Sequence, residues 1–233
     1  MHSGTKYIGG HSDMLCGVVA VRPGKLGDGT QGSDVVRGLR EDRVFLGSVM
    51  GSLEGWLGVR SLRTMELRVQ RQAQSAERLV HWLSSSSLPT IKNVVHSVTH
   101  ASLQALDPAN AWLKDQMPNG YGPVFAIYMK KPEQARQLPS HLRLFHHATS
   151  LGGVESLIEW RRMSDAGVDE RLLRVSIGVE HWEDLRDDLL RSFENVEKGE
   201  EGRGSEMREG NRMGEVQIGQ EGAEMPEAAS GAV

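Results

Sequence analysis

The pattern of apolar and polar residues predicts a chain in which strands alternate with helices. The continuous apolar run Met14–Val21 is typical of a strand buried on both faces of a sheet, and residues 22–34, rich in Gly and Asp, are typical of a loop. From residue 62 the apolar positions recur every three or four residues as far as Leu83, which predicts one long amphipathic helix. A serine run followed by Pro89 is expected to end that helix.

Four shorter apolar segments predict further strands. Three of them are residues 94–99, 124–129 and 142–145, and a looser alternation over 172–179 makes the fourth. The apolar stripe from Trp182 to Val196 predicts a last amphipathic helix. Strands alternating with helices indicate an α/β or α+β module of roughly 130 residues behind the long helix. No internal repeat is visible in the sequence.

Charge sets the end of the chain apart from its body. Residues 198–233 hold four basic residues and eight Glu, which account for the whole net charge of −4. They contain eight Gly and no aromatic residue, so they are predicted to be disordered. The balanced body lacks the basic stripe that nucleic-acid binding needs, so no nucleic-acid partner is expected. Polar residues of the long helix, Arg68 among them, are expected to face solvent.

Composition excludes other classes of protein. The run Met14–Val21 is far shorter than the roughly 18–20 residues that cross a bilayer, and no signal peptide is visible, so a cytoplasmic protein without a membrane partner is expected. Cys16 has no second cysteine in the chain with which to form a disulfide. The pair His146 and His147 lacks the further ligands of a metal centre, so no metal is expected.

A lysine near the start of the chain is the first candidate for chemistry. The hydroxyls of Ser3 and Thr5 precede Lys6 by three residues and one residue. A lysine amine attacks an aldehyde only when it is neutral, and hydroxyls beside it can bind a phosphate on the same ligand. The same residue types are common in exposed loops, so this segment by itself does not distinguish a cofactor site from a surface loop.

Three sequence blocks in a fixed order favour the cofactor site. Residues 5–13 (TKYIGGHSD) resemble the lysine segment of the pyridoxal-phosphate enzymes of cysteine and methionine metabolism, the trans-sulfuration family. Residues 150–157 (SLGGVESL) are similar to that family's loop near the substrate, and residues 173–180 (LRVSIGVE) to the strand with its substrate-carboxylate arginine. Residues 57–64 resemble the junction between its two domains. The resemblance spans residues 2–196.

The resemblance implies a role for individual residues. Lys6 would bind pyridoxal phosphate covalently and shuttle protons, and Ser3 and Thr5 would donate hydrogen bonds to its phosphate. Arg174 would hold the substrate α-carboxylate in a bidentate fork, for which guanidinium geometry is suited. Ser150 would border the same pocket. Without the resemblance, Arg174 is better interpreted as a solvated strand residue and Ser150 as a turn residue.

The resemblance also implies the fold class and the domains. The expected fold is α/β, the C-terminal portion of a fold-type I pyridoxal-phosphate-dependent transferase. Residues 1–61 would be a remnant of the large cofactor domain, 62–196 the long helix with the small C-terminal α/β domain, and 197–233 the acidic tail. Family members carry the cofactor lysine near mid-chain, so roughly the first half of the pattern is absent. This N-terminally truncated chain is therefore expected to be inactive alone.

The family's chemistry makes or breaks a carbon–sulfur bond in substrates such as cystathionine, homocysteine derivatives or cysteine. The expected function is that of a carbon–sulfur lyase of the cystathionine β-lyase type, acting on cystathionine or a related thioether and homo-oligomeric in its full-length form. Leu151 stands where bacterial cystathionine β-lyases carry Trp, so a γ-synthase or γ-lyase is an alternative. Another is a non-catalytic truncated paralogue that docks onto a full-length relative through its small domain.

Overall fold

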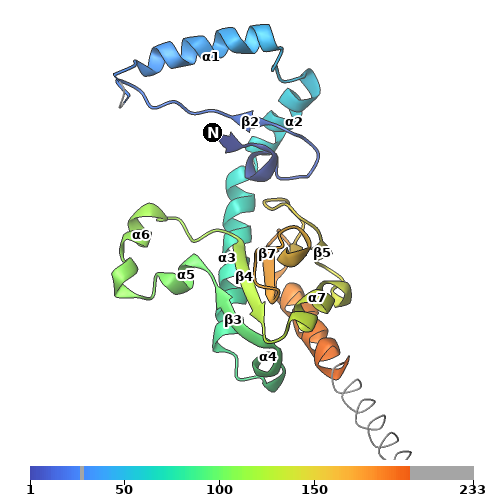
Figure 1. Cartoon of the computed structure of the whole chain (residues 1–233). Helices are drawn as coiled ribbons and strands as arrows, with labels where there is room; N and C mark the ends of the chain where they lie inside the picture. Colours follow the sequence, from blue (N-terminus) through green and yellow to red (C-terminus); the bar gives the residue numbers. More distant parts are fainter. Residues whose placement is uncertain (27–28, 200–233) are drawn as a thin grey trace, which may run out of the picture.

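The computed structural model describes residues 1–26 and 29–199, and α3 (Met65–Ser85) joins its two parts (Figure 1). The N-terminal part holds two short antiparallel strands and two helices: β1 (His2–Ser3), β2 (Gly17–Val18), α1 (Gly32–Leu46) and α2 (Ser52–Leu62). The predicted division between residues 61 and 62 falls in the last turn of α2. The assignment of the two parts as domains stays a prediction.

The second part is built on a five-stranded sheet with the order β3-β4-β7-β6-β5. Neighbouring strands are antiparallel except β5 and β6, which are parallel. The strands are β3 (Val95–Thr99), β4 (Val124–Met129), β5 (His146–His147), β6 (Leu157–Trp160) and β7 (Leu172–Ser176). The accompanying helices are α4 (Pro89–Val94), α5 (Ala101–Gln104), α6 (Trp112–Gln116), α7 (Pro132–His141) and one over residues 182–199.

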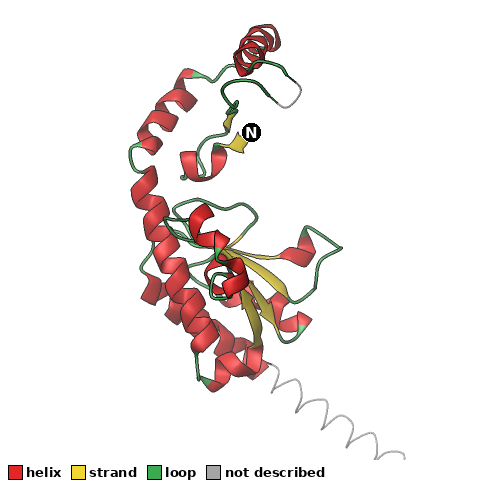
Figure 2. Cartoon of the chain, turned by 90° about the vertical axis from the view of Figure 1, so that its left-hand side faces the viewer, coloured by secondary structure: helices red, strands yellow, loops and turns green. Residues whose placement is uncertain are grey.

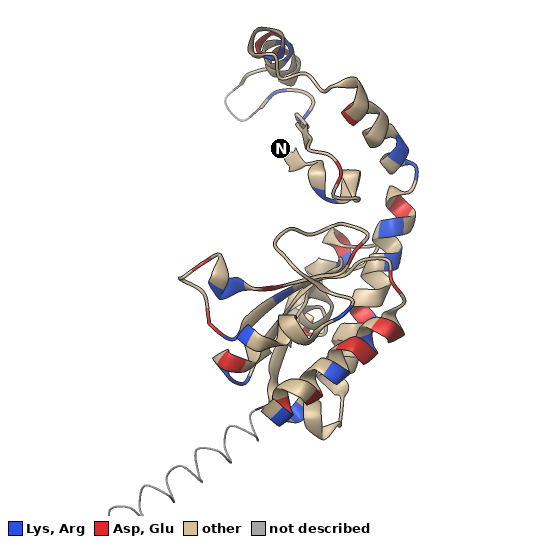
Figure 3. Ribbon diagram, turned by 90° about the vertical axis from the view of Figure 1, so that its right-hand side faces the viewer, with Lys and Arg blue, Asp and Glu red and all other residues tan. Residues whose placement is uncertain are grey.

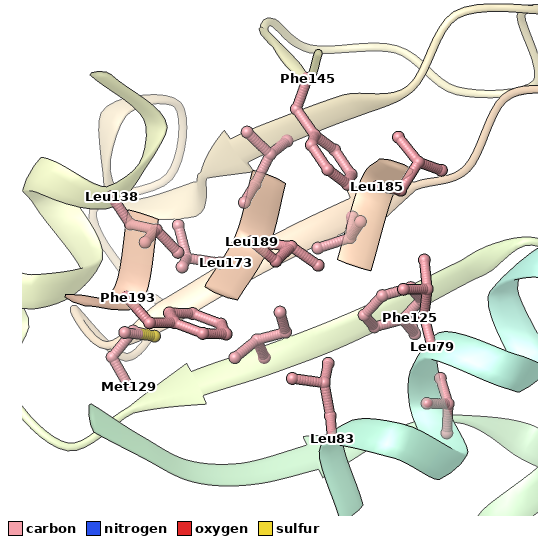
Figure 4. Close-up of a cluster of buried hydrophobic side chains, with 14 of the residues drawn as sticks. Leu79, Leu83, Phe125, Met129, Leu138, Phe145, Leu173, Leu185, Leu189 and Phe193 are labelled. Atoms are coloured by element: carbon pink, nitrogen blue, oxygen red, sulfur yellow. The ribbon is translucent and has the colours of Figure 1, made fainter. Parts of the chain in front are cut away.

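One face of the sheet is buried against helices. In β4, Phe125, Ile127 and Met129 are buried, while the residues between them are only partly buried. These side chains pack with apolar residues of α3, α7 and the 182–199 helix, including Leu79 and Leu189 (Figure 4). In Figure 2, α3 runs along one side of the sheet. Burying each large apolar side chain contributes about 1.5–3 kcal/mol before the entropy of ordering is subtracted, so this layer is the core of the protein.

Several predicted elements are confirmed. Strands lie within residues 94–99, 124–129 and 172–179, and the long helix ends at Ser85, inside the serine run. That helix begins at Met65 and not at the predicted residue 62, which is the last residue of α2. The last helix begins at residue 182 as predicted. This helix continues through residue 199, past the predicted start of the tail at 197, and the rest of the predicted tail lies outside the described residues.

The predicted buried strand over residues 14–21 is wrong. Only Gly17 and Val18 form a strand there, and both are exposed. An apolar run is buried on both faces only when it lies inside a covered sheet. Within residues 1–26 and 29–199, β2 pairs with the two residues of β1 alone. The loop predicted over 22–34 is too long, because α1 begins at Gly32.

The predicted strand over residues 142–145 is also wrong. Strand β5 begins only at His146. The buried carboxylate of Asp188 accepts hydrogen bonds from the backbone N–H groups of Arg143, at 3.0 Å, and Leu144, at 2.8 Å. These donors therefore cannot pair with a neighbouring strand.

The solvent-facing position predicted for Arg68 on the long helix is wrong as well. Its side chain is buried, at 6% exposure, because it reaches from α3 to the N-terminal segment.

Candidate cofactor and substrate site

The candidate lysine lies in a tight turn held against two helices. Residues Thr5–Gly9 form one helical turn interrupted at Lys6, whose ψ of −113° is not helical. Gly10 closes it in the left-handed region, φ 67°, with its N–H donating to Lys6 O at 2.7 Å. The turn contacts α2 and α3, so the folded helices fix the position of the lysine backbone.

Arg68 fastens this turn to the long helix. Its guanidinium donates to the carbonyl oxygens of Tyr7 and Ser61, each at 3.1 Å, and to the Thr64 hydroxyl at 3.2 Å. A Cβ on Gly10 would collide with this guanidinium, so the close approach requires glycine there. Burial, and to a lesser degree the charge of Arg60, lowers the pKa of Arg68.

The loop at residues 150–153 meets the lysine turn from the other part of the molecule. The Lys6 amine donates to the hydroxyl of Ser150 at 2.6 Å, and the Ser12 hydroxyl donates to a carboxylate oxygen of Glu155. A Cβ on Gly152, where φ is 82°, would lie 3.0 Å from Tyr7 N and 3.1 Å from Lys6 C. The loop thus packs directly on the lysine backbone.

Arg174 completes the group from the face of the sheet opposite the helical core. It lies in β7 directly opposite Glu159 of β6, and its guanidinium forms an ion pair with that carboxylate at 2.8 Å. The same guanidinium nitrogen donates to Ser150 O at 2.7 Å. Burial lowers the pKa of Arg174, and against this the charge of Glu159 raises it while Arg161 lowers it.

The structure therefore brings together three of the five predicted site residues: Lys6, Ser150 and Arg174. Thr5 lies beside Lys6, with its hydroxyl accepting from Cys16 N at 3.2 Å. Ser3 is an exposed residue of β1, opposite Gly17. The roles of all five stay predictions.

The residues that the sequence did not single out are those that hold the site residues in place. Arg68 holds the lysine turn, and Glu155 accepts a hydrogen bond from Ser12. Glu159 forms an ion pair with Arg174, and Arg161 donates to Glu159. The sequence offered one signal, a carboxylate at 159 among apolar residues. Its meaning depends on the pairing of β6 with β7, which the sequence does not reveal.

The donor set fits part of a phosphorylated aldehyde and its amino-acid substrate. The Lys6 amine can condense with an aldehyde, and the Arg174 guanidinium can bind a carboxylate. Buried without a hydrogen-bond partner among the described residues, Arg174 Nε is a donor that a bound carboxylate would satisfy.

The described part of the chain shows neither a metal centre nor a membrane-spanning helix. No group of three or more His, Cys, Asp or Glu residues there is placed to hold a metal ion. No helix in that part is both long and apolar enough to cross a membrane. In Figure 3 acidic and basic residues are interspersed along α3.

Comparison with known proteins identifies the family. Residues 1–194 match the family model of the Cys/Met metabolism PLP-dependent enzymes. The chain is 30% identical over 207 residues to a cystathionine β-lyase of Bacillus subtilis (84% of this chain, 49% of the relative). It is 32% identical over 211 residues to a cystathionine γ-synthase of Escherichia coli (85% and 50%).

Solved structures agree with the sequence comparison. A methionine γ-lyase from Micromonospora echinospora superposes with a TM-score of 0.69 at 34% identity, covering 82% of this chain and 48% of that one. The predicted fold class, part of a fold-type I enzyme, is confirmed. The chain spans about half the length of the curated relatives it matches. It belongs to the family of Cys/Met metabolism enzymes that depend on pyridoxal phosphate.

Proposed function

We propose that this chain carries the lysine and the carboxylate-binding arginine of an enzyme that uses pyridoxal phosphate to make or break carbon–sulfur bonds. Its substrates would be cystathionine or a related thioether amino acid. The observation that carries the proposal is the meeting of Lys6, Ser150 and Arg174, which come from three distant segments. When bound, pyridoxal phosphate supplies an electron sink for bonds at the α-carbon of an amino acid.

The chain's own residues would supply binding and proton transfer. Lys6 would hold the cofactor aldehyde, with Ser3 and Thr5 donating hydrogen bonds to its phosphate. The Lys6 amine, 2.6 Å from the Ser150 hydroxyl, has a neighbour with which it can share a proton. Arg174 would bind the substrate α-carboxylate, because a guanidinium offers two parallel donors to two carboxylate oxygens.

Within this family we favour cleavage of the cystathionine β-lyase type. Relatives of similar identity are named as β-lyase, γ-synthase and γ-lyase, so the reaction must be read from products. The test is to co-express this chain with the half of the Bacillus subtilis β-lyase that it does not cover and to supply cystathionine. Pyruvate and homocysteine are expected, whereas 2-oxobutyrate and cysteine would overturn the β-lyase assignment.

Lysine variants keep that assay specific. Lys6→Ala is expected to abolish turnover, because it removes the amine. Lys114→Ala is the matched control, since it removes an exposed lysine of α6 in the other part of the chain. Turnover that survives Lys6→Ala would refute the proposed function.

The second candidate function is docking, and an exposed apolar face favours it. Phe45, Leu46, Leu53 and Trp56 of α1 and α2 are 62–88% exposed, and α1, the start of α2 and the segment around Leu15 line a groove of about 1080 Å³. A face this apolar is costly to leave in water. We infer that this apolar face is covered by the cofactor domain of a family member. In the full-length form, the same contact would lie within a cytoplasmic homo-oligomer.

Co-elution with the full-length Bacillus subtilis relative tests docking. Phe45→Asp is expected to abolish co-elution, because it places a charge in the apolar face. Met163→Asp is the control: Met163 is 68% exposed and lies in the sheet-containing part. Equal co-elution of both variants with the relative would contradict docking through this face.

A further inference from the structure

Arg174 belongs to a small charged cluster on the face of the sheet opposite the helical core. Glu159 is almost fully buried, at 2% exposure, and its carboxylate faces Arg174 at 2.8 Å. Arg161, in the single turn after β6, donates from one nitrogen to both carboxylate oxygens of Glu159, at 3.1 and 3.2 Å. The Ser164 hydroxyl also donates to Glu159. Among the residues that the structure describes, every group that donates to this carboxylate thus lies in β7 or in the turn between β6 and β7.

The charges in this cluster do not cancel. Arg174 paired with Glu159 alone would be neutral, and a neutral pair attracts an incoming carboxylate weakly. Arg161 adds a second positive charge on the same carboxylate, so two guanidiniums share one negative charge. Burial raises the pKa of Glu159, but the hydrogen bonds from Ser164 and Arg161 and the charges of both arginines lower it by more. Glu159 therefore stays ionised at neutral pH.

We propose that Glu159 and Arg161 are positioning residues for Arg174: Glu159 fixes the guanidinium, and Arg161 offsets the charge of Glu159. The cluster then presents one net positive charge to one carboxylate. This inference rests on the proposed function, in which Arg174 binds the α-carboxylate of an amino acid. A monoanionic carboxylate is the ligand that such a site matches in charge.

A series of variants of the full chain that remove single charges tests the inference, with acetate as the probe. Binding is followed by the ¹H–¹⁵N signals of the Arg174 guanidinium, identified by their loss in Arg174→Lys. Arg161→Gln makes the cluster neutral and is expected to weaken acetate binding about fivefold to thirtyfold, the effect of one nearby unit charge at an effective dielectric constant of roughly 20–40. Glu159→Gln combined with Arg161→Gln restores one net positive charge and is expected to return binding to within about threefold of wild type.

Two further variants separate charge from structure. Arg161→Lys keeps the charge and is expected to bind acetate nearly as tightly as wild type. Arg186→Gln removes a positive charge from the 182–199 helix, where Arg186 pairs with Asp187, and is expected to leave acetate binding unchanged. A role in packing alone predicts that the double variant is worse than Arg161→Gln, because it loses more contacts.

The outcomes distinguish this inference from the proposed function. If wild-type Arg174 does not respond to acetate, both are overturned. If it responds but Arg161→Gln binds as well as wild type, or the double variant or Arg161→Lys stays as weak as Arg161→Gln, only the role of Glu159 and Arg161 is overturned.

Discussion

Replacing Gly152 by Ala tests whether the loop at residues 150–153 packs on the lysine turn. Gly152 has φ 82°, and a Cβ there would lie 3.0 Å from Tyr7 N and 3.1 Å from Lys6 C. Backbone atoms at that distance must move apart, and such overpacking typically costs about 1–3 kcal/mol. A left-handed backbone adds about 1–2 kcal/mol for any residue with a Cβ.

The matched control is Gly122→Ala. Gly122 has φ 80°, but no atom of a described residue lies within 4 Å of an added Cβ, so this variant carries the backbone strain without the crowding. Hydrogen exchange of residues 4–10, followed by mass spectrometry, measures how often the lysine turn opens. Relative to the control, Gly152→Ala is expected to speed exchange about 5- to 150-fold, the factor that corresponds to 1–3 kcal/mol. Equal exchange in the two variants would refute the direct packing of loop on turn.

Three other predictions concern the sheet-containing part, each followed by urea denaturation. Leu189→Ala is expected to lower the free energy of unfolding by about 2–5 kcal/mol, since Leu189 is fully buried. The control Leu67→Ala, at a position 69% exposed, should change it by less than about 0.5 kcal/mol. Similar losses of stability in the two variants would contradict the described core. Asp188→Ala leaves the N–H groups of Arg143 and Leu144 without their acceptor and should lower the free energy of unfolding by about 2–4 kcal/mol. Asp188→Asn keeps an oxygen and should lower it by less. Equal stability of wild type and Asp188→Ala would show that these two hydrogen bonds are not formed. Glu159 has a pKa below its usual 4.5, because the stabilising hydrogen bonds and charges outweigh burial. Its contribution to the free energy of unfolding is therefore present above about pH 4.5 and is lost as the pH falls through the lowered pKa. Glu159→Gln should flatten this loss of stability in acid, and a pH profile of stability unchanged by the variant would contradict the lowered pKa.

The spacing of apolar residues predicted those elements that are buried against other parts of this chain. Strand β4 and the last helix have one buried face each, and their apolar spacing follows directly from that burial. The strand predicted over Met14–Val21 failed because burial depends on neighbouring strands, and among the described residues β2 pairs with β1 alone. Residues 142–145 failed because a distant carboxylate, Asp188, takes their backbone donors.

The same limit applies to the site. Lys6, Ser150 and Arg174 were found through a family resemblance, not through spacing, since nothing local marks them as neighbours. Glu159 was missed because β6 was not predicted as a strand: a charged residue in a buried position breaks the apolar pattern by which a strand is recognised. Its ion pair with Arg174 forms only because β6 and β7 pair in the register that sets the two residues opposite each other. Chemistry that depends on strand register cannot be derived from one sequence alone.

Covalent trapping tests whether the Lys6 amine binds the cofactor, as the proposed function requires. The chain, co-expressed with the uncovered half of its Bacillus subtilis relative, is incubated with pyridoxal phosphate, reduced with borohydride, digested and sequenced by mass spectrometry. The phosphopyridoxyl label is expected on Lys6 and on no peptide of the Lys6→Ala variant, while Arg174→Ala keeps the label. A label that maps to another lysine, or equal labelling of Lys6→Ala, would contradict the account.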